Sequence, residues 1–144
     1  ELLYRRVPNT PELVRSAGGR PFVTTSAFND RSEKPSVDRA LLRNSPSESQ
    51  TQPTDGVICL IAAEVRAISS VALDEPIAEA GRTHYAIDVL ARPIFAGNPE
   101  GEPENLSHAQ IEADPAYRSK SRFRKLKEAL ALLANNRGWA IKPS

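Results

Sequence analysis

The chain has 144 residues, of which 40% are hydrophobic and 26% are charged, and its formal net charge at pH 7 is +1. This length suits one domain, and this composition is that of a folded globular protein. A single cysteine, Cys59, excludes an intramolecular disulfide and a cysteine metal cluster, and no apolar run approaches the ~20 residues that span a bilayer. We therefore expect one cytoplasmic domain over residues 1–144, outside the membrane, without a metal or a cofactor.

Short segments fill the first third of the chain. Residues 1–7 alternate in polarity like a strand, and a proline ends this pattern. The next segments predict a short helix or helical turn over 10–19, which opens with Thr-Pro and closes with Gly-Gly, and a second strand over 21–28. A brief helix is expected over 36–44, with Ser36 as its N-cap.

The middle of the chain holds the best candidate for a central strand. Residues 57–63, VICLIAA, form the most apolar run and are expected to be buried on both faces of a sheet. A helical turn over 63–68 and strands over 69–73 and 84–95 are expected to follow. Residues 108–113 fit either a strand or a helix.

The chain ends in one long predicted helix, with Ser119 or Ser121 as its N-cap. Because strands fill the first two thirds and this helix fills the end, we expect an α+β fold. Its sheet would be twisted and mostly antiparallel, with the C-terminal helix packed on one face. The polar segments near 45–56 and 97–105 predict mobile loops. The apolar stripe of the helix consists of Phe123, Leu126, Leu130 and Leu133.

Charge is unevenly distributed along the sequence. Residues 51–117 carry 3 basic and 11 acidic groups, whereas residues 118–144 carry 8 basic groups and 1 acidic group. The cations crowd into the first half of the predicted helix, where the macrodipole places about half a positive charge and makes each cation unfavourable by a few tenths of a kcal/mol. A compensating anion is therefore expected there. Six residues form this candidate binding surface, here called the basic cluster: Arg118, Lys120, Arg122, Arg124, Lys125 and Lys127.

Two sources of that anion are open. One is external, a nucleic-acid backbone or an acidic protein surface, and Arg20 or Arg39 could then extend the basic cluster. This hypothesis predicts a non-enzymatic binding module, one component of a larger prokaryotic assembly. A further alternative for the function is a purely structural subunit, held in place by its apolar surface.

The second possible source of the anion is internal, since five acids precede the helix and could fold back on it: Glu100, Glu102, Glu104, Glu112 and Asp114.

Patterns typical of catalysis or metal binding are sparse. His84 and His108 are the only histidines, and no HExxH or CxxC motif is present, so we expect no zinc site. Ser107 and Glu112 are close to His108 in sequence, but closeness in sequence is not the geometry of a triad. The sequence therefore favours binding over chemistry and leaves an enzymatic function open.

One stretch, LYRRV…RPFVTTSAF, resembles the opening of ADP-ribosyltransferase and related NAD-cleaving toxin folds. The resemblance implies that Arg5 or Arg6 binds the phosphates of NAD and that Glu64 holds the ribose. Read from the residues alone, FVTTSAF is a β-strand whose hydroxyls bond to neighbouring strands. The segment that the resemblance assigns to the pocket consists of Thr24, Thr25 and Ser26.

A second resemblance covers more of the chain. GRPFVTTSAFND, SVDRALL, VICLIAAEVRAI and ENLSHAQIEAD together resemble a family of small uncharacterised bacterial proteins. That family carries an Arg-Pro…Ala-Phe…Asp segment, a Ser-Val-Asp and a late histidine. The resemblance implies a prokaryotic source and one compact domain, and it implies no activity.

Overall fold

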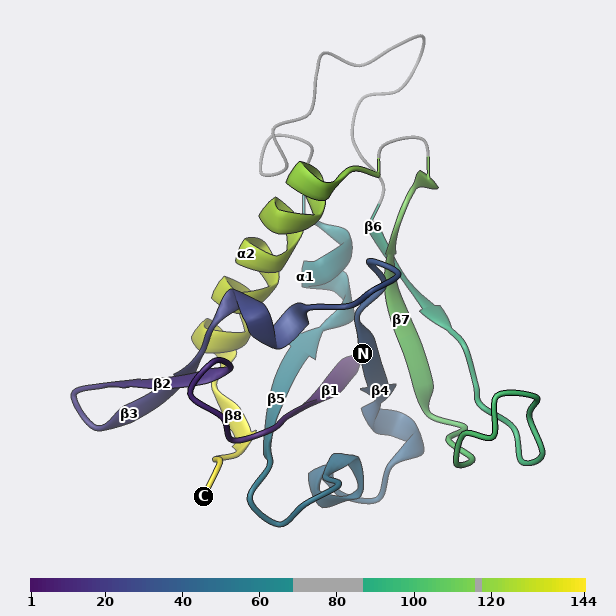
Figure 1. Cartoon of the computed structure of the whole chain (residues 1–144), viewed down its shortest axis with the longest axis horizontal. Coiled ribbons are helices and arrows are strands. Elements are labelled where there is room, and N and C mark those ends of the chain that lie inside the picture. The colour runs from purple at the N-terminus through teal and green to yellow at the C-terminus, as the bar shows by residue number, and fades with distance from the viewer. Residues whose placement is uncertain (69–86, 116–117) are drawn as a thin grey trace, which may run out of the picture.

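The computed structural model describes residues 1–68, 87–115 and 118–144 (Figure 1). Its main feature is a six-stranded sheet in the order β6-β7-β4-β1-β5-β8, in which every pair of neighbours is antiparallel. The predicted strand over 69–73 and the first part of that over 84–95, with His84, lie outside the described residues. The strands are β1 (Leu2–Val7), β4 (Ser36–Arg39), β5 (Gly56–Ile61), β6 (Ile87–Ala91), β7 (His108–Ala113) and β8 (Trp139–Ile141).

The long helix α2 (Lys120–Arg137) packs on one face of this sheet, beside the short helix α1 (Ala62–Arg66) (Figure 1). Leu126 and Leu130 are buried, and Phe123 and Leu133 pack against the core at the edges of the same stripe. The predicted α+β fold with an antiparallel sheet and a C-terminal helix is therefore confirmed. None of the helices in the described ranges is long and apolar enough to cross a bilayer.

Alternation along the strands divides the side chains between two faces of the sheet. One face carries the buried apolar residues and meets α2. The opposite face presents Tyr4, Asp38 and His108, which the pairing of β1, β4 and β7 places side by side. The buried residues of the first face include Leu3, Val7, Val37, Ile58, Leu60, Ala109 and Ile111.

Of the helix or helical turn predicted over 10–19 only one turn forms, in which the Val14 amide donates to the Thr10 carbonyl at 2.9 Å. Residues 14–23 form a hairpin of β2 (Val14–Ala17) and β3 (Arg20–Val23). Gly18 and Gly19 both adopt positive φ, at 58° and 76°, which is the backbone of a tight two-residue hairpin turn. The Gly-Gly pair therefore reverses a hairpin and does not end a helix.

Two other local predictions also need correction. The strand predicted over 21–28 ends at Val23, and the 3₁₀ turn η1 (Thr25–Phe28) then buries Phe28 in the core. Ser36 does not cap a helix but opens strand β4, and a short 3₁₀ turn, η2 (Ala40–Leu42), follows that strand. Pairing with β4 also settles the ambiguous segment 108–113 as a strand.

The polar segment 45–56 contributes more to the fold than its composition suggests. It contains the 3₁₀ turn η3 (Pro46–Ser49), and Ser49 and Asp55 are both buried. Burial acts to raise the pKa of Asp55, but hydrogen bonds from the Gln52 and Thr51 amides, together with Arg6, hold it below its ordinary value. The mobility predicted for 45–56 and 97–105 stays a prediction.

Candidate functional site

The basic cluster lies at the start of α2, as the sequence predicts. Helix α2 begins at Lys120, and the Ser119 hydroxyl accepts a hydrogen bond from the Arg122 amide at 3.2 Å, which confirms Ser119 as the N-cap. No acidic residue occupies the first turn. Arg118, Lys120 and Arg124 are exposed. This helix end therefore presents cations to solvent at the positive pole of its own dipole.

Several members of the basic cluster contact the chain itself. Arg118 donates to the Ser32 carbonyl at 3.4 Å. Lys127 donates to Asn29 Oδ1 at 2.8 Å and lies 5.1 Å from the centre of the Phe123 ring. Arg122 and Lys125 also have interaction partners. Within the described parts of the chain, Lys120 and Arg124 are the members for which no hydrogen bond or ion pair is found, so they are the best-placed residues for an external anion.

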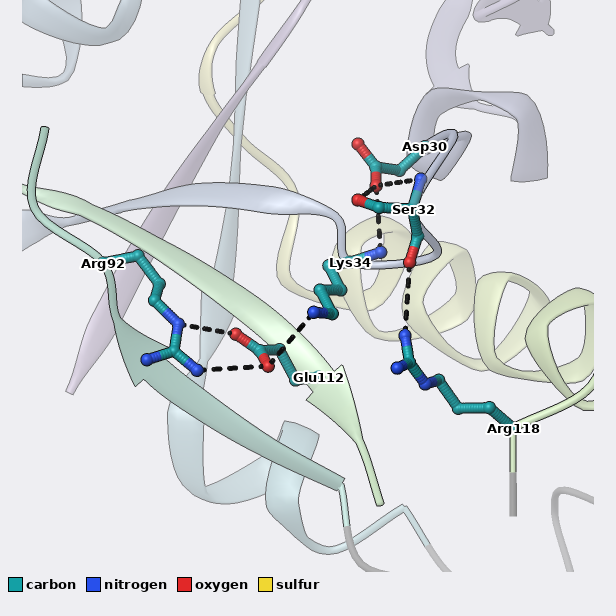
Figure 2. Close-up of polar contacts among 6 residues, drawn as sticks. All are labelled: Asp30, Ser32, Lys34, Arg92, Glu112 and Arg118. Carbon is teal, nitrogen blue, oxygen red and sulfur yellow. Dashed lines mark hydrogen bonds and ion pairs between the residues drawn. The ribbon is translucent and has the colours of Figure 1, made fainter. Parts of the chain in front are cut away.

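The loop before β4 supports the start of α2, and Figure 2 shows how its own polar groups are engaged. Asp30 Oδ2 accepts hydrogen bonds from the Ser32 amide, the Ser32 hydroxyl and the Lys34 amide, at 2.6 to 3.0 Å. Glu33 has a φ of 60° and lines a small hollow together with Arg118 and Arg122. Sequence reasoning did not point to Glu33, because it lies more than 80 positions before these two arginines in the sequence.

Most of the acids that the sequence offered as internal partners for the basic cluster either bind other cations or lie away from the start of α2. Glu112 accepts hydrogen bonds from Arg92 at 2.9 and 3.3 Å and lies 4.0 Å from Lys34 (Figure 2). Three of the other acids lie in the loop that precedes β7, at the end of that strand opposite to the start of α2 (Figure 1). Asp114 has an interaction partner. The three acids in the loop are Glu100, Glu102 and Glu104.

Arg20 and Arg39 do not extend the basic cluster. Arg39 forms an ion pair with Glu1 at 2.8 Å. Arg20 opens β3, and that strand contacts the far end of α2, where the Asn135 side chain exchanges hydrogen bonds with the Val23 main chain. The basic cluster is therefore confined to one end of one helix.

A second site was not predicted from the sequence: a cleft of about 540 Å³ where the pairing of β1 and β4 stops. The two strands pair only at Leu3 with Arg39 and at Tyr4 with Asp38. Beyond this point the Arg5 guanidinium donates to the carbonyls of Ala27 and Ser36 and lies 5.2 Å from the centre of the Phe28 ring. The residues of this central cleft that matter here are Arg5, Ser36, Asp38, Arg43, Asn105 and His108.

Arg5 is a cation held mainly by neutral groups. Desolvation by the surrounding protein lowers its pKa to about 10. It keeps some accessible surface because it lines the central cleft. No ion pair to Arg5 is found among the described residues, although the negative charge of Asp30 acts against the desolvation and raises this pKa.

Asp38 organises the floor of the cleft. Its Oδ2 accepts hydrogen bonds from Arg43 at 3.1 Å and from Ser49 at 2.6 Å, and its Oδ1 accepts from Asn105 at 2.9 Å. Burial acts to raise the pKa of Asp38, but the bonds from Ser49 and Asn105 and the charge of Arg43 outweigh it, and the pKa lies below its usual value. The carboxylate is therefore a structural anchor with its acceptors occupied.

Ser36 and His108 form a hydrogen-bonded pair in the cleft. His108 Nδ1 lies 2.7 Å from the Arg92 carbonyl, which can only accept, so Nδ1 carries the proton in the neutral ring. His108 Nε2 is then an acceptor, and the Ser36 hydroxyl donates a hydrogen bond to it at 3.0 Å. Ser107 is not part of this pair, since it is buried and donates to Asn105.

Segments from the bacterial resemblance meet in this cleft. Ala27, the Ser-Val-Asp of β4 and His108 all line it, and the two members of the Ser36–His108 pair are 72 positions apart. These short segments were the available signal in the sequence, but strand register decided which side chains meet. The resemblance itself stays a prediction.

The residues carried over from the ADP-ribosyltransferase resemblance do not share one pocket. Arg5, Arg6 and Ser26 line the central cleft, whereas Thr24 donates its hydroxyl proton to the Glu12 carbonyl at 2.6 Å. Glu64 is an exposed residue of α1, 3.9 Å from Arg137, and lines a different hollow. An NAD site of the implied composition is therefore not assembled by the described residues.

The described residues contain no group of three or more histidine, cysteine, aspartate or glutamate side chains that could hold a metal ion. Cys59 is buried, which raises the pKa of its thiol, as expected for a structural cysteine. Comparison with protein-family models, curated proteins and solved structures found no match to this chain.

Proposed function

We propose that this chain is a binding module that recognises a polyanion through the basic cluster of α2. A nucleic-acid backbone is the preferred ligand, and an acidic protein surface is the alternative. The observation that carries the proposal is the exposed pair Lys120 and Arg124 on a helix end without an acid in its first turn. Glu112 is engaged by Arg92 and Lys34 and does not neutralise this end.

The spacing of the cations supports a linear, densely charged ligand. Lys120, Arg124 and Lys127 follow at intervals of four and three residues, which places them along one side of the helix over about 10 Å. Duplex DNA carries one charge per about 1.7 Å of its axis, so several phosphates fall within this length. The arginine forks also suit the geometry of phosphate oxygens.

The proposal includes a place in a larger prokaryotic assembly in the cytoplasm. A single cysteine, buried and unpaired, accords with a reducing compartment. A partner with an acidic protein surface would use the same cations and would be distinguished by a preference for polyglutamate over nucleic acid.

Fluorescence anisotropy with labelled single-stranded RNA, single-stranded DNA, duplex DNA and polyglutamate tests the proposal. Reversal of two charges in Lys120→Glu/Arg124→Glu is expected to weaken binding of a nucleic acid at low salt by at least about tenfold. The matched control, Arg15→Glu/Arg20→Glu, makes the same change of charge on the exposed β2–β3 hairpin. It should bind like the unaltered chain.

Equal loss of binding in the two double variants would show that net charge, and not the basic cluster, sets affinity. Tighter binding of polyglutamate than of every nucleic acid would favour the acidic protein partner. Absence of binding to all four probes at low salt would contradict the proposal.

A further inference from the structure

The central cleft holds a serine, a histidine and a main-chain carbonyl in a connected line, apart from the basic cluster. The Ser36 hydroxyl donates to His108 Nε2 at 3.0 Å, and His108 Nδ1 donates to the Arg92 carbonyl at 2.7 Å. The Arg92 amide also donates to the His108 carbonyl at 2.9 Å. The strand pairing therefore fixes both the tautomer and the orientation of the ring.

This arrangement is the one that activates a serine hydroxyl. A nucleophile within hydrogen-bond reach of a base, with the base oriented by a third group, is the geometric signature of covalent catalysis. Ser36 and His108 both line the central cleft and also an adjoining hollow of about 780 Å³. Cavities of this size accommodate small molecules.

The charges differ between the two hollows. Arg5, Arg6 and Arg43 line the central cleft together with Asp38 and Glu48, whereas the adjoining hollow is also lined by three acids, Asp30, Glu102 and Glu104. An anionic ligand therefore fits the central cleft better than the adjoining hollow.

The Ser36 main-chain carbonyl accepts a hydrogen bond from Arg5, so this guanidinium lies next to the main chain of Ser36. Arg43 lines both hollows, and its Nε is a buried donor for which the described residues supply no acceptor. Arg43 forms an ion pair with Asp38 at 3.1 Å, so these two charges largely offset each other, and Arg5 is a cation of the cleft for which no ion pair is found among the described residues.

We propose that the central cleft is a hydrolytic site in which Ser36 is the nucleophile and His108 is its general base, acting on esters of small anionic acids. This activity is separate from the polyanion binding proposed for the basic cluster. The sequence predicted a non-enzymatic module instead. Ser36 and His108 are 72 positions apart and come together only in the folded chain, so no sequence pattern pointed to this pair.

The reaction balances without any further reactant except water. Ser36 Oγ attacks the ester carbonyl carbon and passes its proton to His108 Nε2. Collapse of the tetrahedral intermediate breaks the bond to the alcohol oxygen, which takes that proton and leaves. Water then attacks the acyl group on Ser36, with His108 accepting its proton and returning it to Ser36 Oγ as the carboxylic acid departs. Arg5 would hold the anionic end of the acyl group.

A fluorophosphonate probe tests the nucleophile directly. Ser36 Oγ is expected to bond to phosphorus with loss of fluoride, and intact mass followed by peptide mapping should place one adduct on Ser36 of the unaltered chain. His108→Gln should slow labelling by at least about 100-fold. Ser26→Ala is the matched control, because Ser26 lines the same cleft, and should label normally.

A pair of 4-nitrophenyl esters tests the substrate class. The hemisuccinate, which is anionic, should be hydrolysed faster than the butyrate of the same chain length, and Ser36→Ala should lose both activities. Thermal melting and binding of the polyanion show whether each variant is folded, and the mapped adduct on the unaltered chain needs no variant at all. Labelling that is absent, lies on another serine or is unaffected by His108→Gln overturns the proposal, and equal hydrolysis of the two esters overturns its anionic substrate.

Discussion

The start of α2 and the central cleft both gather cations, but in opposite settings. The basic cluster comes from ten consecutive positions, and Arg118, Lys120 and Arg124 are exposed. The cleft is assembled from distant segments, and Asp38 at its floor has three side-chain partners. Charge on an exposed helix end is available for binding and contributes little to the fold, whereas the charges around Asp38 hold the fold together.

The largest expected effect lies in the cleft. Asp38→Ala removes the acceptor of Arg43, Ser49 and Asn105 and leaves buried donors without partners, so the free energy of unfolding should fall by about 3 kcal/mol. Urea unfolding followed by circular dichroism measures this change. Asp38→Asn, which keeps one acceptor oxygen, should be destabilised less. If the free energy of unfolding falls by less than about 0.5 kcal/mol, as is typical of a surface position, the charges around Asp38 do not hold the fold together.

Lowering the pH is expected to have a smaller effect on the free energy of unfolding. The pKa of Asp38 in the folded chain lies below its usual value, and that of the unfolded chain is about 3.9. The stabilisation from its ionised form is therefore complete above the unfolded pKa and is lost as pH falls through the folded pKa. The difference in unfolding free energy between the unaltered chain and Asp38→Asn should be constant near neutral pH and narrow below about pH 4. A difference that grows with acid would contradict this assignment.

The smallest expected effect on stability is a gain, and it comes from a substitution in the basic cluster. Lys120→Glu replaces an unfavourable cation with a favourable anion in the first turn of α2, so the chain should become about 0.5 kcal/mol more stable while its affinity for a polyanion falls. Thermal unfolding and anisotropy on the same preparation check both changes, and Lys120→Gln should lie between the two. Should stability and affinity fall together, Lys120 would be a structural residue.

Sequence patterns predicted those features that depend on neighbouring residues. The apolar spacing of Leu126 and Leu130 and the Ser119 cap set the start and buried face of α2. The alternation of residues 1–7 and the apolar run that opens at Val57 likewise predicted β1 and β5. These signals lie within a few positions of one another, so the sequence alone carries them.

The cleft could not be predicted in the same way. Ser36 was expected to cap a helix, because serine is a common N-cap residue, but pairing with β7 made it a strand residue opposite Gln110. That register also brings His108 to Ser36 and Asn105 to Asp38. Strand register across more than 60 positions is decided by the packing of the whole sheet, for which no short motif exists.

The dependence of polyanion affinity on salt tests the proposed function most directly. For the unaltered chain, the logarithm of the association constant should fall linearly with the logarithm of the KCl concentration, because neutralised phosphates release counterions. For Lys120→Glu/Arg124→Glu the slope should be shallower by about two, one for each phosphate that the variant no longer neutralises. Parallel lines for the two proteins would contradict the account, since they would show that these two residues meet no phosphate.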